Sequence, residues 1–145
     1  MRFDLEVTID RPVADVFAYV SDVRNLPQWQ QSADAAEWIE EGKRFSERRS
    51  FLGRTAQLEL EVTAREENRR FDVRSVSGPV RFEIRHSFAD AGDGTRLSVT
   101  ADAKITGALR LPARMAQGQA ERQFKSDLQR LKKILETDTT TEAGA

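Results

Sequence analysis

The chain has 145 residues, 39% hydrophobic and 32% charged, and its 23 basic and 24 acidic residues leave a formal net charge of -1. This length predicts one domain, and the balanced charge argues against a nucleic-acid-binding protein. The absence of cysteine excludes disulfides and thiolate metal sites, and the single histidine, His86, excludes a multi-histidine zinc site. No apolar run reaches the roughly 18 residues of a membrane span, and the alternating N-terminus predicts no signal peptide. We therefore expect a soluble, cytoplasmic protein without metal or cofactor.

The first nine or so residues alternate between apolar and charged side chains, which is typical of a strand with one buried face. Apolar residues then recur at every third or fourth position over residues 13–20, after Pro12, and predict a helix. Ser21 or Asp22 can cap a second short helix, and Pro27 limits its length. The N-terminal segment is therefore expected to be a strand followed by two short helices.

Six further strands are predicted over about residues 34–105. Turn signals separate them at residues 41–42, 52–53, 67–68, 78–79 and 92–94. Between these turns, apolar side chains alternate with charged ones, as in residues 56–62 and 80–88. Each strand thus has one apolar and one charged face, which is typical of an antiparallel sheet with one face in water.

A long helix is predicted from about residue 111 to about residue 135. One stripe of this helix carries Glu121, Phe124, Leu128, Leu131 and Leu135. Residues 137–145 have no apolar side chain larger than alanine and are expected to form a disordered tail, which leaves residues 1–136 as a single domain. Because the apolar sheet face must be covered, we expect an α+β fold in which a curved seven-stranded antiparallel sheet grips the long helix.

The order of these elements and two segments, IDRPVADVF (residues 9–17) and SDVRNLPQW (21–29), resemble the SRPBCC (START-like) superfamily, with the polyketide cyclase/dehydrase-like branch most similar. The C-terminal helix, with DLQRLKK at residues 127–133, supports the resemblance, which covers residues 2–136. The resemblance implies the helix-grip fold and a deep cavity between sheet and long helix for an apolar, polyketide- or lipid-like molecule. It carries over no catalytic residue, since proteins of this scaffold differ in function.

Polar side chains interrupt the predicted apolar faces at three places. In the third strand, Glu47 and Arg49 are in phase with Phe45 and Phe51. Charges on a buried face must be paired or solvated. Either a water-accessible cavity or a bulge near residues 46–48, which would turn both charges outward, accounts for them.

The second place is His86, on the apolar face of its strand. A neutral imidazole has one donor and one acceptor, so His86 can bind a ligand hydroxyl or carbonyl or act as a general base. The alternative is a core histidine bonded to a neighbour. The third place is the start of the long helix, where Arg114, Gln117 and Glu121 continue the stripe and either roof a cavity or project into water.

We expect the ligand to contact the aromatic and polar residues nearest the cavity, namely Trp29, Trp38, Glu47, Arg49, Ser75, Phe82, His86, Arg114, Gln117 and Glu121. The first functional hypothesis is a binder or carrier of a hydrophobic small molecule, acting as a monomer or homodimer, with no nucleic acid partner and no integral membrane association. The second is a cyclase, aromatase or dehydratase acting on a polyketide-like substrate, with His86 as the candidate base. The third is a protein-interaction domain with a filled core.

Overall fold

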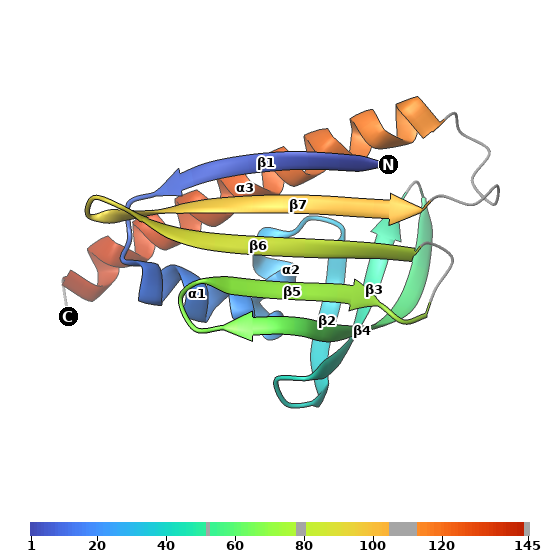
Figure 1. Cartoon of the computed structure of the whole chain (residues 1–145), viewed down its shortest axis with the longest axis horizontal. Coiled ribbons are helices and arrows are strands. Elements are labelled where there is room, and N and C mark those ends of the chain that lie inside the picture. Colours follow the sequence, from blue (N-terminus) through green and yellow to red (C-terminus); the bar gives the residue numbers. More distant parts are fainter. Residues whose placement is uncertain (52, 78–80, 105–112, 144–145) are drawn as a thin grey trace.

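The computed structural model describes residues 1–51, 53–77, 81–104 and 113–143 (Figure 1). Its elements in chain order are β1 (Arg2–Ile9), α1 (Val13–Ser21), the 3-10 helix η1 (Val23–Asn25), α2 (Leu26–Trp29), β2 (Ala33–Glu40), β3 (Arg44–Phe51), β4 (Arg54–Glu66), β5 (Arg70–Ser75), β6 (Arg81–Ala91), β7 (Gly94–Lys104) and α3 (Ala113–Ala143). This order confirms the predicted fold class.

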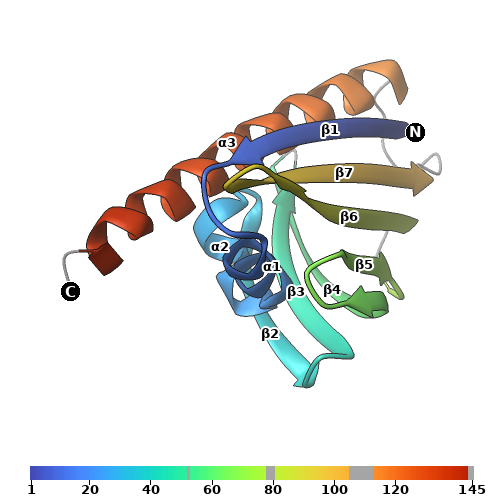
Figure 2. The same cartoon turned by 60° about the vertical axis from the view of Figure 1, so that its left-hand side comes forward.

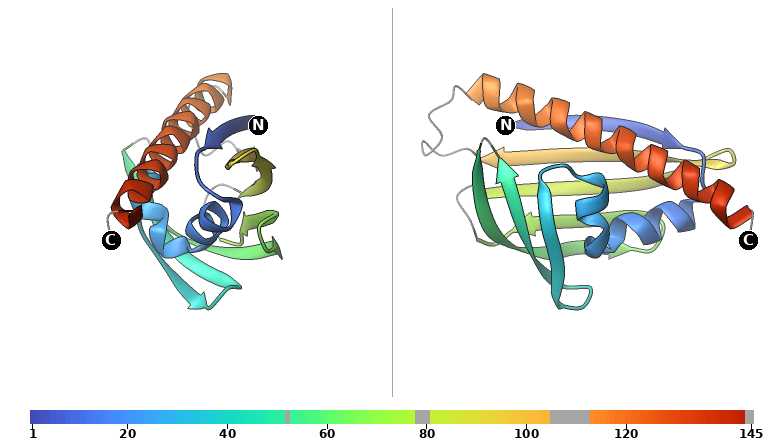
Figure 3. Two further views of the ribbon diagram at one scale, coloured as in Figure 1. Left: turned by 90° about the vertical axis from the view of Figure 1, so that its left-hand side faces the viewer. Right: turned by 180° about the vertical axis from the view of Figure 1, so that it is seen from behind.

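The seven strands form one antiparallel sheet in the order β1-β7-β6-β5-β4-β3-β2. From β2 to β7, each strand pairs with its neighbour in the chain, and β1 closes the other edge by pairing with β7. The sheet curves strongly, so that β2 and β3 run across the direction of β6 and β7 (Figure 2). Seen along its length, the sheet forms a trough, and α3 lies across the open side (Figure 3).

The turns at residues 41–42, 67–68 and 92–94 lie where the sequence predicts them, whereas the turn predicted at 78–79 and Leu52 lie outside the described residues. Gly42 and Gly92 adopt φ of 77° and 70°, a region that glycine enters without steric cost. Gly94 is required for a different reason, because a Cβ atom there would lie 2.6 Å from the carbonyl oxygen of Ile9. The close approach of these two backbones seats the end of β1 against the start of β7.

The short helices differ in detail from the expectation. Asp22 caps the 3-10 helix η1 by accepting a hydrogen bond from the backbone N–H of Arg24 at 3.1 Å, as predicted for one of the two candidate caps. The second helix continues directly from η1 into α2, so Pro27 does not end it. Pro27 lies in the first turn of α2 instead, where no intrahelical N–H donor is needed.

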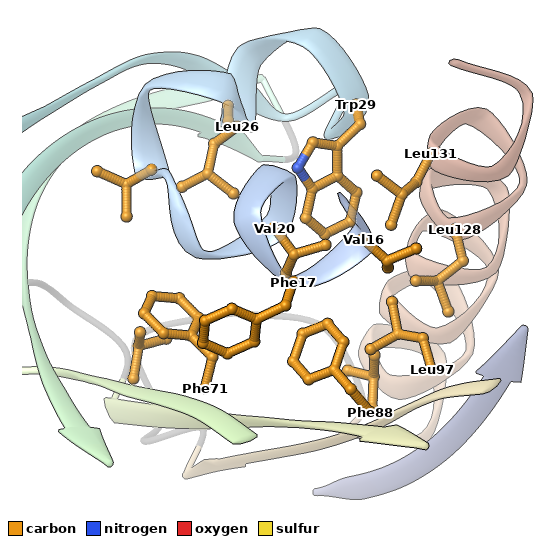
Figure 4. Close-up of a cluster of buried hydrophobic side chains, with 14 of the residues drawn as sticks. Val16, Phe17, Val20, Leu26, Trp29, Phe71, Phe88, Leu97, Leu128 and Leu131 are labelled. Carbon is orange, nitrogen blue, oxygen red and sulfur yellow. The ribbon is translucent and has the colours of Figure 1, made fainter. Parts of the chain in front are cut away.

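The long helix α3 packs chiefly against β1 and contacts α2. Its residues Leu128 and Leu131 are buried, as predicted, and meet the side chains of α1, α2 and the sheet (Figure 4). The predicted helix end near Leu135 was wrong, because α3 runs to Ala143 through much of the expected disordered tail. No helix-breaking residue stops it before residue 144, and Glu136 ties it to the backbone N–H of Asp10 at 2.8 Å.

Candidate functional site

A cavity of about 290 Å³ lies between the concave sheet face and the helices. Its walls are mostly apolar, because every second residue along a strand points inward and most of these residues are aliphatic or aromatic. Small side chains on facing elements, Ala101 of β7 and Ala120 of α3, line it and leave space. The larger apolar lining residues are Phe3, Val20, Val23, Leu26, Trp29, Phe45, Leu58, Leu60, Phe71, Val73, Phe82, Ile84 and Phe124.

Two charged residues of β3 form an ion pair on the cavity wall, with the glutamate buried and the arginine partly exposed. Glu47 is only 1% exposed, and Arg49 donates from Nε to Oε1 at 2.9 Å and from Nη2 to Oε2 at 3.0 Å. The pairing of β3 with β4 runs without a register shift from Arg44 to Phe51, so the bulge considered near residues 46–48 is not formed. The register shifts lie in the β2–β3 pairing instead, and both charges face inward.

Arg49 also connects β3 to the segment that follows α2. Its Nη1 donates to Oγ of Ser32 at 2.6 Å, and its Nη2 donates to Oε1 of Gln30 at 2.8 Å. We call the cavity-lining residues Gln30, Ser32, Glu47, Arg49, Gln123 and Asp127 the polar cluster. Within this cluster, Arg49 balances the charge of Glu47 and donates hydrogen bonds to Glu47, Ser32 and Gln30, which is the condition for burying that carboxylate.

Asp127 joins α3 to the polar cluster. Its Oδ1 accepts hydrogen bonds from the backbone N–H of Gln31 at 3.1 Å and from Nε2 of Gln123 at 2.9 Å. Burial raises the pKa of the Asp127 carboxyl above its ordinary value, and the two hydrogen bonds only partly oppose this change. Asp127 therefore links residues 30–32 to α3, although burial disfavours the charged form of its carboxyl group.

His86 lies on β6 with 5% of its surface exposed, and its ring tilts against that of Phe71. Its Nδ1 lies 2.8 Å from the carbonyl oxygen of Phe71. A carbonyl oxygen only accepts, so Nδ1 must carry the proton. Burial lowers the pKa of His86, which keeps the imidazole neutral and leaves Nε2 as an unprotonated acceptor. Within the described residues, this buried Nε2 has no hydrogen-bond partner.

Trp29 is the last residue of α2 and is 1% exposed. Its indole nitrogen lies on the side of the ring away from Leu131 (Figure 4). The Nε1–H donor is buried and has no partner among the residues that the structure describes. Trp29 and His86 both line the cavity, and each has one buried polar atom without a partner in the described chain, a donor in Trp29 and an acceptor in His86.

The structure brings five of the predicted site residues to the cavity wall and leaves four others away from it. The five are Trp29, Glu47, Arg49, Phe82 and His86. Among the four, Trp38 packs edge-on against Phe45 with ring centroids 5.7 Å apart, and Ser75 accepts a hydrogen bond from the backbone N–H of Phe82 at 3.0 Å. Neither is among the cavity-lining residues of the described chain.

The remaining two, Gln117 and Glu121 of α3, are not among the cavity-lining residues of the described chain either. Gln117 donates to the carbonyl oxygen of Arg2 at 3.2 Å, and Glu121 is half-buried. Because α3 packs against β1, the helix presents Ala120, Phe124 and Asp127 to the cavity instead. The side chain of Arg114 lies outside the described residues.

Sequence reasoning missed several members of the polar cluster. Asp127 had a usable signal, since it lies three residues after Phe124 and four before Leu131 and so shares their helix face. Gln30 and Ser32 had none, because they lie between α2 and β2, where no periodicity operates. Across the ranges described, no group of three carboxylate or imidazole side chains lies close enough together to hold a metal ion.

Residues 1–136 match a family model described as polyketide cyclase / dehydrase and lipid transport. The chain belongs to this family. The match confirms the resemblance inferred from the N-terminal segments and the C-terminal helix. A search of curated proteins gives no match. No helix within the described ranges has the length and apolar character needed to cross a membrane.

Solved structures show the same fold. A START superfamily protein from Mycobacterium smegmatis is 19% identical with a TM-score of 0.82, covering 94% of this chain and 97% of that chain. The protein TTHA0849 from Thermus thermophilus is 22% identical with a TM-score of 0.80, covering 92% and 95%. The di-domain ARO/CYC BexL from the BE-7585A biosynthetic pathway is 15% identical with a TM-score of 0.76, and the match covers 94% of this chain and 46% of BexL. These similarities establish the helix-grip architecture.

Proposed function

We propose that this protein binds a hydrophobic small molecule in the cavity between the sheet and α3. The observation that carries the proposal is the apolar cavity of about 290 Å³ in an otherwise packed interior. Protein interiors are close-packed, and a void forfeits the dispersion contacts of the side chains that line it. Ligand pockets begin at roughly 300 Å³ and are mostly apolar with a few polar groups, as this one is.

Family membership supports the same class of ligand. The description of the matching family names polyketide cyclase / dehydrase and lipid transport, both of which concern largely apolar molecules. The aromatic lining residues Phe45, Phe71 and Phe82 favour a flat or ring-containing body, because aromatic rings stack or pack edge-on with one another. We therefore assign the ligand to the polyketide- or lipid-like class. The cavity also counts against a protein-interaction domain with a filled core.

The test is a titration with N-phenyl-1-naphthylamine, an uncharged probe whose fluorescence rises in apolar surroundings. We expect saturable binding of one probe per chain and a higher melting temperature in its presence. Ala101→Leu places a larger side chain in the cavity and should weaken binding. Ala89→Leu is the matched control, because Ala89 points to the opposite face of the neighbouring strand β6 from the buried Phe88. Absence of saturable binding, or equal affinity in Ala101→Leu and the wild type, would contradict the proposal.

A second candidate, a cyclase, is favoured by one observation: His86 lines the cavity, and its Nε2 has no partner within the described part of the chain. A general base in that position could remove a proton from a carbon between two carbonyl groups of a poly-ketone. His86→Ala should then lower turnover of such a substrate by roughly 10²–10⁴-fold. If His86 only binds, the same substitution should weaken affinity by a hydrogen bond, about 0.5–1.5 kcal/mol, with no turnover in either protein.

A further inference from the structure

We infer that the cavity selects its ligand through a hydroxyl group, which donates a hydrogen bond to Nε2 of His86, while a ligand oxygen accepts from Nε1–H of Trp29. This inference rests on the proposed function and deepens it. It narrows the ligand class from hydrophobic molecules in general to hydroxylated ones, such as phenols and enols on a ring system.

The polarity of His86 is fixed by its neighbour on β5. Nδ1–H donates to the carbonyl oxygen of Phe71 at 2.8 Å, so Nε2 of the neutral ring carries no proton and can only accept a hydrogen bond. A hydroxyl group satisfies that lone pair by donating a proton. An ether, ketone or carboxylate has only lone pairs of its own at its oxygen, so it would leave Nε2 unpaired and repel it. His86 thus discriminates between ligand groups of nearly equal size.

Trp29 has the opposite polarity. Its indole N–H only donates, and Trp29 lines the cavity from α2, whereas His86 lines it from β6. Native proteins rarely leave buried polar atoms without a partner, since each such atom has lost its hydrogen bonds to water. Two residues that line one cavity thus have buried polar atoms of complementary polarity, unpaired within the described residues, and this combination points to a ligand that supplies the missing partners.

The test compares three competitors that share one apolar body: naphthalene, 2-methoxynaphthalene and 2-naphthol. Each is titrated against protein loaded with N-phenyl-1-naphthylamine. We expect 2-naphthol to bind about tenfold more tightly than 2-methoxynaphthalene, which corresponds to about 1.4 kcal/mol. The difference has this size because Nε2 of His86 has a hydrogen-bond donor in the complex with 2-naphthol and none in the complex with 2-methoxynaphthalene.

In His86→Phe the ratio between these two affinities should fall to near one while the probe still binds. Phe82→Leu is the matched control, because Phe82 lies on the same strand and lines the cavity without a polar side-chain atom. It should weaken all competitors and preserve the ratio.

A measurement on the wild-type protein avoids any variant that fails to fold. His86 is the only histidine, so the imidazole nitrogens give one pair of ¹⁵N resonances. We expect Nδ1 to be protonated and Nε2 unprotonated at pH 7, and the Nε2 resonance to shift with 2-naphthol but not with 2-methoxynaphthalene. Equal affinities and equal shifts, as expected if a bound water already satisfies His86, would overturn this inference and leave the proposed function intact. If neither the probe nor any competitor binds, both fail.

Discussion

Substituting Arg49 by methionine tests how the polar cluster is stabilised. Methionine keeps much of the length of the arginine side chain but removes four hydrogen bonds, two to Glu47 and one each to Ser32 and Gln30. The carboxylate of Glu47, 1% exposed, would then lie in the protein interior without its cation. The consequence should be a loss of folding stability, because the buried carboxylate of Glu47 would lose the cation that pairs with it.

Removal of one partner from a buried ion pair costs about 3–5 kcal/mol, a large fraction of the roughly 5–15 kcal/mol by which proteins of this kind are stable. Removal of both charges, in Glu47→Leu/Arg49→Met, should cost much less. Only the buried acceptor of Gln30 then loses its donor, since the hydroxyl of Ser32 can turn to another partner. We expect the double variant to lie within about 1–2 kcal/mol of the wild type.

The assay is urea unfolding at pH 7, followed by the fluorescence of the two tryptophans, with midpoints compared at unchanged slope. Arg44→Met is the matched control, because Arg44 lies on the same strand and pairs with Glu59 at 2.7 Å while both side chains are nearly half exposed. That substitution should cost less than about 1 kcal/mol. A cost for Arg49→Met as small as that of Arg44→Met, or a double variant less stable than Arg49→Met, would contradict a stabilising role for the ion pair.

The strands and their orientation could be predicted because that information is local. A period of two with charges on the opposite face assigned His86 to the inner face of β6 and Leu97 to that of β7, and both are buried. The alternation also continues without a bulge through β3, which places Glu47 on the inner face. With seven such strands and one long amphipathic helix, few architectures can cover the apolar face, so the fold followed from the pattern.

The rotation of α3 and the partners of the polar cluster could not be predicted in the same way. Asp127 bonds to the backbone of Gln31, 96 positions away in the chain, and no local period encodes such a pair. Of the predicted stripe, Phe124 lines the cavity and Leu128 and Leu131 are buried, but one turn earlier Ala120 lines the cavity in place of Glu121. Two adjacent residues of a helix can both fall within the width of one apolar stripe. The sequence pattern alone therefore does not determine which of the two faces the cavity.

Three further results are expected. Leu131→Ala, at a fully buried position of α3, should cost about 2–5 kcal/mol in urea unfolding, and an unchanged midpoint would argue against the buried stripe. Asp127→Asn keeps the acceptor oxygen and should be more stable than the wild type at pH 7, because the raised pKa of Asp127 means that its charged form is disfavoured in the folded state. This difference in stability should shrink as the pH falls toward 3.8. It should vanish below that pH, where the wild-type carboxyl is protonated in both the folded and the unfolded state. His86 should make the folded protein less stable, not more stable, as the pH falls, since its pKa is lowered in the folded state. As the pH falls below the ordinary histidine value of 6.5, the unfolded chain takes up a proton that the buried imidazole does not, so stability should fall by up to about 1.4 kcal/mol per pH unit. Because the chain has no other histidine, His86→Phe should remove this slope between about pH 6.5 and 5.5, as measured by urea midpoints. A wild type and variant with parallel pH dependence would mean that His86 takes up its proton over the same pH range in the folded and unfolded chains, so that burial does not lower its pKa.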